Sequence, residues 1–420
     1  MNQELYRATF VRPSPRMPGV LYEPLTKGDK SHIGVLVMHS DNDYLDQPTG
    51  PELAKRGYTV LCTNTADPSQ SLSMKVCDAK QGFELLKHLD GIEKVVLMGH
   101  SGGATLMSAY QNLAENGVKT FQGPEKLIKC PDSLDGLTPA DGLMCLDSNW
   151  GNGAMRLFGV DPAVVDDGNG LRIDESLNMF NPANGYSPEG CTYSEEFLKR
   201  FFQAQSDRNN RHIAYALERL AAIEAGRGMY ADDEPMIIAG SSHIGPNNKL
   251  FPQDPRLLSR TKEARTLLHK GGVVTTEIVH TVRKPKFLQS RTASLAMGAM
   301  HTTVKKFLDA HAVRTVDGYG YDACEVRGID WTSSYNCTPG NIMGVTVPLL
   351  VAAMTAGYEF SAAETIYNNA ASADKTIAFV EGANHDFFPD KECERFEGEF
   401  GDTVKTLFDY VDQWLSARFL

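Results

Sequence analysis

The sequence lacks any long hydrophobic run. No stretch of about 18 uncharged apolar residues occurs in the 420-residue chain, so none is long enough for a membrane-spanning helix. The N-terminal segment MNQELYRATFVRPSPRMP has no apolar centre of the kind found in secretory signals. Positive charge is also in short supply, since 41 Lys and Arg residues face 53 Asp and Glu, a net charge of −12. We therefore expect neither a membrane nor a nucleic acid as partner.

Motifs for metals and nucleotides are absent as well. The sequence contains no H-E-x-x-H motif, no phosphate-binding loop and no glycine-rich dinucleotide pattern after a predicted strand. Its eight cysteines form no C-x-x-C pair, and several lie in apolar runs such as TVLCTN and GLMCLD. Such cysteines are typical of reduced thiols in the core of a cytoplasmic protein. We expect a cytoplasmic protein with no metal and no cofactor.

Short apolar runs alternate with helical patterns at both ends of the chain, which indicates βαβ units around a parallel sheet. The predicted strands lie at 33–38, 58–63, 95–98, 142–146, 345–353 and 376–380, after a strand pair within 5–23. The predicted helices lie at 49–57, 78–89, 104–110, 362–371 and 401–415. The predicted fold class is therefore α/β, with a mostly parallel central sheet flanked by helices.

Residues 151–340 do not show this alternation of apolar runs and helical patterns, since the segment is rich in predicted loops and has few apolar runs. Helical patterns occur at 194–224, 256–270 and 290–311, and the best strand candidates are 236–239 and 273–279. The α/β alternation stops near Trp150 and resumes after residue 340. We therefore predict one core domain formed by residues 1–150 and 341–420, interrupted by a large, mainly helical insertion at 151–340.

The most informative motif is KVVLMGHSGGAT, at residues 94–105. A buried strand, a glycine-flanked serine and a helix follow one another, as in the G-x-S-x-G turn that presents a nucleophilic serine. A serine at so sharp a turn has strained backbone angles, so the residues two positions to either side must be nearly free of side chain. We predict that Ser101 is the nucleophile.

A nucleophilic serine needs a base, because its hydroxyl is scarcely ionised at neutral pH. His385 follows the last predicted strand in the turn EGANHDF, which is where the order serine, acid, histidine places the base. An ordinary loop histidine is the alternative, but the order and the placement favour a catalytic role.

The acid that orients the histidine is expected after an earlier strand. Glu359 is the only carboxylate in the loop MTAGYEF, after the strand predicted at 345–353, and we rank it first. Asp147, at the end of the strand predicted at 142–146, is the alternative acid, and a surface glutamate capping the next helix is the competing interpretation of Glu359.

An oxyanion in the reaction needs two N–H donors. One is expected from Gly102, the residue after the nucleophile, and the other from the loop HSDN that follows the strand at 33–38. The backbone N–H of Asp41 is our candidate for the second donor, although its carboxylate would have to turn away from the oxyanion.

The motifs GHSGG, HSDN and GANH resemble those of the α/β-hydrolase superfamily over residues 33–150 and 341–420. The resemblance implies a triad of Ser101, His385 and an acid, with the insertion as a cap over the substrate pocket. Two departures concern the donor and the acid. Ser40 replaces the usual glycine after His39, and Gly357 stands where the family has an aspartate, with Glu359 two residues later.

The favoured function is a serine hydrolase that cleaves an ester or lactone of a bulky, partly apolar small molecule through an acyl-enzyme. The same triad also serves thioesterases, amidases and carbon–carbon bond hydrolases, so these alternatives stay open. A non-catalytic ligand-binding protein on the same scaffold is the third hypothesis. The expected partner is a small-molecule substrate, and the sequence leaves a homo-oligomer open.

Overall fold

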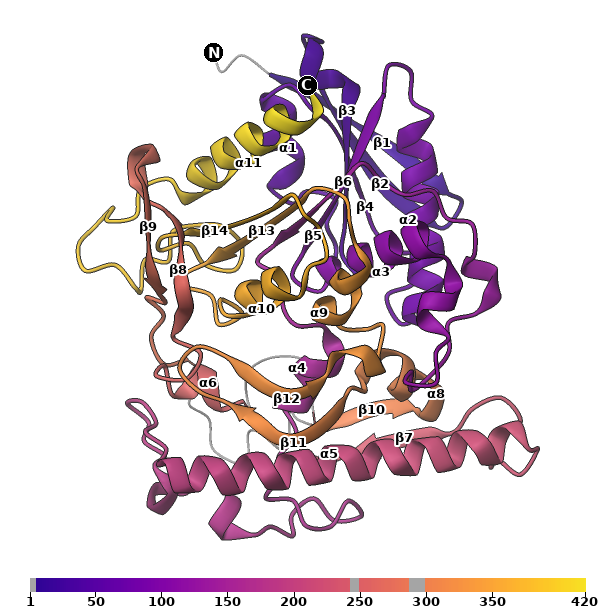
Figure 1. Cartoon of the computed structure of the whole chain (residues 1–420), viewed down its shortest axis with the longest axis vertical. Coiled ribbons are helices and arrows are strands. Elements are labelled where there is room, and N and C mark those ends of the chain that lie inside the picture. Colours follow the sequence, from indigo (N-terminus) through magenta and orange to yellow (C-terminus); the bar gives the residue numbers. More distant parts are fainter. Residues whose placement is uncertain (1–4, 242–248, 287–298) are drawn as a thin grey trace.

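A ten-stranded sheet runs through the core of the protein, whose computed structural model describes residues 5–241, 249–286 and 299–420 (Figure 1). Its parallel strands, in spatial order, are β4 (Thr59–Thr63), β3 (Ile33–Met38), β5 (Lys94–His100), β6 (Gly142–Leu146), β13 (Leu349–Met354), β14 (Lys375–Val380) and β8 (Arg260–Leu268). Antiparallel strands complete the two edges: β1 (Tyr6–Ser14) and β2 (Met17–Pro24) beyond β4, and β9 (Val274–His280) beyond β8. The predicted mostly parallel sheet is confirmed.

The central strands are apolar throughout because both faces of the sheet are covered by helices. Val35 and Val37 of β3 pack in one cluster with side chains of α1 (Thr49–Lys55) and α11 (Thr403–Phe419). Leu36 and Met38 point to the other face, where α2 (Leu72–Lys87), α3 (Gly103–Asn116) and α10 (Ala362–Asn369) lie. The alternation of side chains along a strand thus divides the core into two layers.

The insertion lies at the end of the molecule opposite the two chain termini (Figure 1). Its largest element is α5 (Glu195–Glu224), a 30-residue helix that matches the helix predicted at 194–224. Two small antiparallel sheets accompany it, β7 (Pro235–Ile238) with β10 (Met300–Thr303), and β11 (Arg314–Tyr321) with β12 (Val326–Asp330). Its short helices are α4 (Asn152–Phe158), α6 (Leu250–Gln253) and α8 (Val304–Lys306), with a π-helix at Phe307–His311, and α9 (Thr338–Asn341) closes the segment.

Part of the predicted insertion belongs to the core, so the predicted domain boundaries need correction. The pattern at 256–270 suggested a helix, but β8 forms there and pairs with β14, while β9 pairs with β8. Residues 260–280 therefore extend the main sheet and do not belong to the insertion predicted at 151–340. The apolar residues of this segment fit either periodicity, and the open edge of β14 decides in favour of the strand.

Three other expectations can be compared with the structure. The helix predicted at 290–311 lies in part outside the described residues, and its described part forms β10, α8 and the π-helix. All eight cysteines are unpaired thiols and six of them are buried, as predicted. Among the described residues, every helix is too short or too polar to cross a lipid bilayer.

Candidate active site

Ser101 occupies a strained turn between β5 and α3. Its φ is +54°, one of four positive values among non-glycine residues of the described chain, and such a conformation costs about 1–3 kcal/mol. The Ser101 N–H donates to the Leu146 carbonyl of β6 at 3.3 Å. The predicted strand, sharp turn and helix are therefore confirmed, and the first turn of α3 begins directly after the serine.

The two glycines that flank Ser101 at a distance of two residues are required by close packing. A Cβ atom on Gly99 would lie 2.3 Å from the Cα of Ala104, and one on Gly103 would lie 2.3 Å from the Met38 carbonyl oxygen of β3. Both distances are far below van der Waals contact. The steric argument made from the motif thus holds in the structure, and Gly103 is where α3 rests against the end of β3.

Asp147 and His385 meet at the same edge of the sheet. Asp147 follows β6 with φ +41° and is fully buried. Its Oδ1 accepts the Met354 N–H at 2.9 Å, and its Oδ2 accepts a hydrogen bond from His385 Nδ1 at 2.7 Å. His385 comes from the loop after β14. This bond leaves Nε2 of His385 as the nitrogen available for proton transfer.

Glu359, the acid ranked first from the sequence, also lies beside His385 but farther away. Its Oε2 is 3.8 Å from His385 Nδ1, beyond hydrogen-bond distance, and finds no hydrogen-bond partner among the described residues. Glu359 is only 2% exposed. Burial, together with the nearby charge of Asp147, raises the pKa of its carboxyl. In the structure, therefore, Asp147 accepts the hydrogen bond from His385 and Glu359 does not. This reverses the ranking of the two acids that the sequence suggested.

Two carboxyl groups facing one imidazole alter its titration. Burial alone lowers the pKa of His385, but the opposing charges of Glu359 and Asp147 outweigh it and raise the pKa to about 9. The site thus stabilises the imidazolium, the form that a histidine base adopts after it has accepted a proton.

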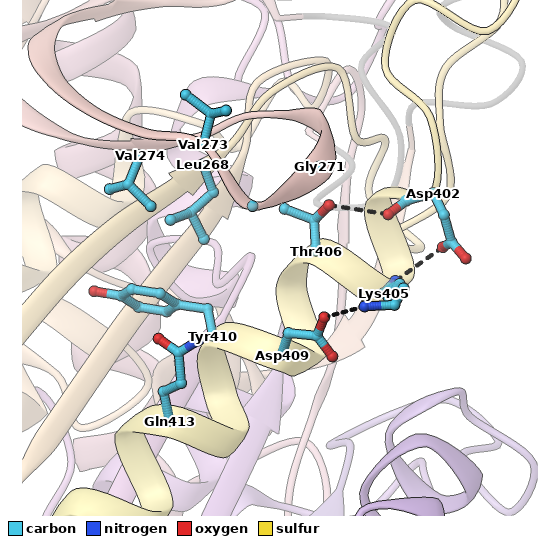
Figure 2. A pocket seen from close by; sticks show the side chains of 11 residues that line it. Leu268, Gly271, Val273, Val274, Asp402, Lys405, Thr406, Asp409, Tyr410 and Gln413 are labelled. Carbon is cyan, nitrogen blue, oxygen red and sulfur yellow. Dashed lines mark hydrogen bonds and ion pairs between the residues drawn. The ribbon is translucent and has the colours of Figure 1, made fainter.

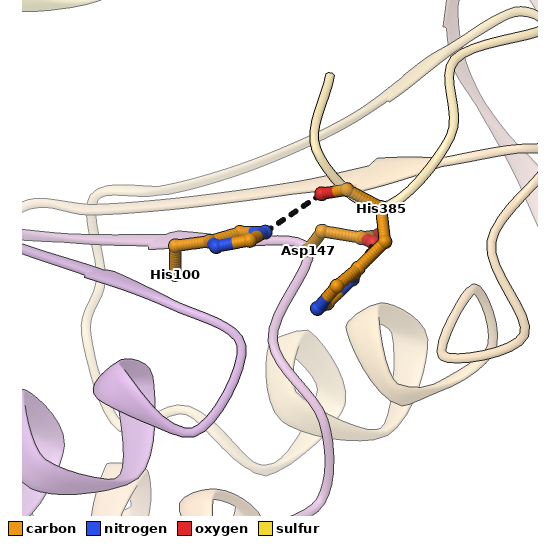
Figure 3. Close-up of side chains that lie close together, drawn as sticks. All are labelled: His100, Asp147 and His385. Atoms are coloured by element: carbon orange, nitrogen blue, oxygen red, sulfur yellow. Dashed lines mark hydrogen bonds and ion pairs between the residues drawn. The ribbon is translucent and has the colours of Figure 1, made fainter. Parts of the chain in front are cut away.

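His100, inside the serine motif, holds the His385 loop in place. Its Nδ1 accepts from the Tyr44 hydroxyl at 2.5 Å, and its Nε2 donates to the His385 carbonyl at 2.7 Å (Figure 3). The sequence did not single out Tyr44.

The side chains of His100, Asp147 and His385 could also bind a metal ion, because their potential ligand atoms lie within 4.8 Å of one another. However, both ring nitrogens of His100 are engaged in internal hydrogen bonds, one of which a metal would have to break.

The loop after β3 differs from the expectation at Asp41. The Asp41 N–H donates to Nδ1 of His39 at 2.9 Å, so it is not free to serve as the predicted oxyanion donor. The carboxylate is paired with Lys75 at 2.6 Å. Although burial acts in the opposite direction, Lys75 lowers the pKa of Asp41 to about 2. The Gly102 N–H, the other predicted donor, lies at the start of α3, where amides lack partners within the helix.

A cavity of about 250 Å³ brings the predicted residues together. Ser101, Gly102, Asp41, Glu359 and His385 all line it, and Asp147 lies behind His385. The rest of its wall is mostly polar and comes from both the core and the insertion: His39, Asn42, Asn149, Asn152, Met155 and Tyr358.

Two neighbouring cavities share wall residues with this one. A cavity of about 320 Å³ between core and insertion shares Asp41 and Asn152. Another of about 230 Å³ shares Tyr358 and His385. Two further cavities therefore lie directly beside the one that Ser101 and His385 line.

A separate cavity of about 310 Å³ lies between α11 and the turn from β8 to β9 (Figure 2). Its polar groups are engaged locally: Lys405 pairs with Asp409, and the Thr406 hydroxyl donates to the Asp402 carbonyl at 3.0 Å. None of the residues predicted for catalysis lines it.

The packing at Gly103 leads to a test of the turn. We expect Gly103→Ala to lower the free energy of unfolding by about 1–3 kcal/mol, because the new methyl group must displace β3 or α3. Urea denaturation followed by circular dichroism measures this loss. Gly28→Ala is the control, since Gly28 has nothing within 4 Å of the added carbon and an extended φ of −143°. Equal stabilities for the two variants would contradict the packing argument.

The charges around His385 lead to a second test. We expect NMR titration of histidine Cε1–H signals to show a His385 pKa well above 6.5, near 9. Asp147→Asn and Glu359→Gln should each lower it, because each removes a negative charge that stabilises the imidazolium. The signal is assigned by its loss in His385→Gln. A wild-type pKa at or below 6.5 would show that the carboxylates do not outweigh burial, and a pKa left unchanged in both variants would show that they do not act on this ring.

No family model and no curated protein matches the chain. Similar solved structures include the siderophore hydrolase EstB from Aspergillus fumigatus, at 12% identity over 98% of both chains with a TM-score of 0.45. A hypothetical protein from Pseudomonas aeruginosa has 12% identity over 99% of this chain and 95% of that chain, with a TM-score of 0.43. A soluble variant of monoglyceride lipase from Saccharomyces cerevisiae has 10% identity, coverages of 99% and 97% and a TM-score of 0.43. Such distant likenesses say nothing of activity.

The fold follows from the chain's own topology. The parallel strands β5, β6, β13 and β14 end at one edge of the sheet, where they present the serine turn, Asp147, Glu359 and His385 in that order along the sequence. As the motifs predicted, the chain has the α/β-hydrolase fold.

Proposed function

We propose that the protein is a serine hydrolase that cleaves an ester or lactone bond of a small molecule. The observation that carries the proposal is the cavity shared by Ser101, at its strained turn, and His385, which is hydrogen-bonded to Asp147. A nucleophile, a base and an orienting carboxylate are the groups that acyl transfer needs.

The reaction proceeds in two steps. Ser101 Oγ attacks the carbonyl carbon while His385, in its neutral form, takes its proton, and the histidine then gives that proton to the departing alcohol oxygen. The bond from the carbonyl carbon to that oxygen breaks and an acyl-serine remains. Water, deprotonated by His385, attacks the acyl-serine in turn, and the proton returns to Ser101 as the carboxylic acid leaves.

Asp147 is our proposed orienting acid. Its hydrogen bond to His385 Nδ1 at 2.7 Å fixes the ring and leaves Nε2 as the nitrogen that transfers the proton. Glu359, at 3.8 Å, adds charge near the ring without orienting it. This assignment moves the acid from the loop after β13, where the sequence favoured it, to the loop after β6.

In place of the bulky, partly apolar molecule expected from the sequence, the polar residues of the cavity wall favour a small ester that carries polar groups. The cavity around Ser101 and its neighbour between core and insertion are lined mostly by side chains that form hydrogen bonds, including Asn152 and Lys75. Such walls suit hydroxyl, amide or carboxylate groups better than a long acyl chain. The insertion contributes Asn152 and Met155 of α4 to the cavity, which supports its role as a cap.

The nucleophile is tested by Ser101→Ala. We expect a loss of at least about 10⁴-fold in kcat/KM for the ester hydrolysed fastest. That ester comes from a panel of short-chain and polar p-nitrophenyl esters, lactones and acyl-CoA thioesters. A fluorophosphonate probe should label the wild type at Ser101 and leave the variant unlabelled. Full activity in Ser101→Ala would contradict the proposal. A preference for thioesters would show that the enzyme cleaves a thioester bond instead, with Ser101 still as the nucleophile.

The acid is tested by comparing two isosteric variants. We expect Asp147→Asn to lower kcat by about 10³- to 10⁴-fold, because the amide cannot stabilise the imidazolium. Glu359→Gln should stay within about tenfold of the wild type, since Glu359 makes no hydrogen bond to the ring. The opposite order of effects would identify Glu359 as the orienting acid.

A further inference from the structure

His39, directly after β3, has a tautomer that its neighbours determine. Its Nδ1 accepts the backbone N–H groups of both Asp41 and Asn42, each at 2.9 Å. A nitrogen that accepts two hydrogen bonds has no proton of its own, so we assign the ring hydrogen to Nε2. Burial lowers the pKa of His39 to about 4, which keeps the ring neutral at neutral pH. His39 therefore presents one N–H donor, on Nε2.

That donor has no partner within the described part of the chain, although His39 is only 4% exposed. Buried polar groups are nearly always hydrogen-bonded, so an unpaired one calls for an explanation, and a catalytic role is one. The ring cannot turn away to find a partner, because Nδ1 is held by two amides. In addition, its face stacks on Tyr44 with the centroids 4.7 Å apart and an angle of 20° between the planes.

The unpaired nitrogen faces the start of α3. A Cβ atom on Gly102 would lie 3.3 Å from His39 Nε2, so the absence of a side chain at Gly102 leaves space beside this nitrogen. His39, Gly102 and Ser101 line the same cavity. His39 Nε2 thus lies close to the backbone of Gly102, the residue after Ser101.

An oxyanion in this cavity would need a second donor besides the Gly102 N–H. The loop after β3 is expected to supply this donor, but the backbone N–H groups of Asp41 and Asn42 both donate to His39 Nδ1 already. We propose that the side chain of His39, through Nε2–H, is the second oxyanion donor. This inference rests on the proposed function and names one more catalytic residue for it.

The role of the donor is electrostatic. As the bond between Ser101 Oγ and the carbonyl carbon forms, the π electrons of the carbonyl move to its oxygen. That oxygen accepts from Gly102 N–H and His39 Nε2–H. Neither donor gives up its proton to this oxygen, and the electron pair returns to re-form the carbonyl when the bond to the leaving oxygen breaks. Fixed donors of this kind act without reorganising.

Two amide variants separate the two nitrogens of His39. In His39→Asn the side-chain oxygen replaces Nδ1 as acceptor for the loop amides, and no donor stands at the Nε2 position. In His39→Gln the amide nitrogen replaces Nε2 as donor, and the acceptor is lost. We expect His39→Asn to lower kcat by about 10²- to 10³-fold with little change in KM. The unfolding temperature should stay near that of the wild type, and His39→Gln should keep at least about tenfold more activity than His39→Asn.

Two kinetic results would overturn the proposal. Activity close to the wild type in His39→Asn would show that Nε2–H does not touch the reacting oxygen. Equal losses in the two variants would show that His39 only supports the loop. A wild type that hydrolyses no ester would instead be a failure of the proposed function, which the Ser101 labelling experiment detects separately.

A spectroscopic measurement gives an independent readout. A boronic acid forms a tetrahedral adduct with an active serine, and its oxygen occupies the oxyanion position. In protein labelled with ¹⁵N-histidine, the Nε2–H proton of His39 should move downfield when the adduct forms, and this signal should be missing in His39→Asn. An adduct at Ser101 that leaves the signal unmoved would contradict the proposal.

Discussion

The close contact between α3 and β3 is the constraint on which the site depends. Gly103 touches the last carbonyl of β3, and this contact is possible only without a side chain. It brings the start of α3 beside the loop that contains His39, while the positive φ of Ser101 turns the serine into the cavity. Ser101, the proposed nucleophile, and both proposed oxyanion donors therefore owe their positions to one contact between two backbones.

The second constraint is electrostatic, since two buried carboxyl groups share one imidazole. Two adjacent buried carboxylates repel each other, and burial disfavours their charged forms. The structure resolves this unequally. Asp147 accepts two hydrogen bonds and Glu359 Oε2 accepts none, so the pKa of Glu359 rises. Asp147 orients the ring of His385 through a hydrogen bond. Glu359 lies too far away to orient the ring, but its negative charge stabilises the protonated form of His385.

The sequence predicts features that are set locally and fails where distant segments decide. The strands at 33–38 and 142–146 and the turn at Ser101 follow from apolar runs and glycine spacing, and all of them form as expected. The segment at 256–270 fits a helix as well as a strand, and only the edge of β14 settles it. The amide of Asp41 looked available because nothing in the motif HSDN shows that His39 folds back to accept it. Likewise, the choice between Asp147 and Glu359 depends on a difference of about one ångström that no spacing encodes.

The insertion is tied to the catalytic edge more closely than a separate cap would be. Asp147 and α4 are separated by only four residues, so the proposed acid and the first wall of the cavity lie on one continuous segment. Asn152 at the start of α4 reaches back to the Asp41 carboxylate at 3.4 Å, beside the loop that holds His39. Farther along, β8 and β9 return the insertion to the sheet next to β14, the strand that precedes His385. Changes that reshape the cavity at Ser101 would therefore also move Asp147 and the loop that holds His39, so in the proposed hydrolase specificity and catalysis would be coupled.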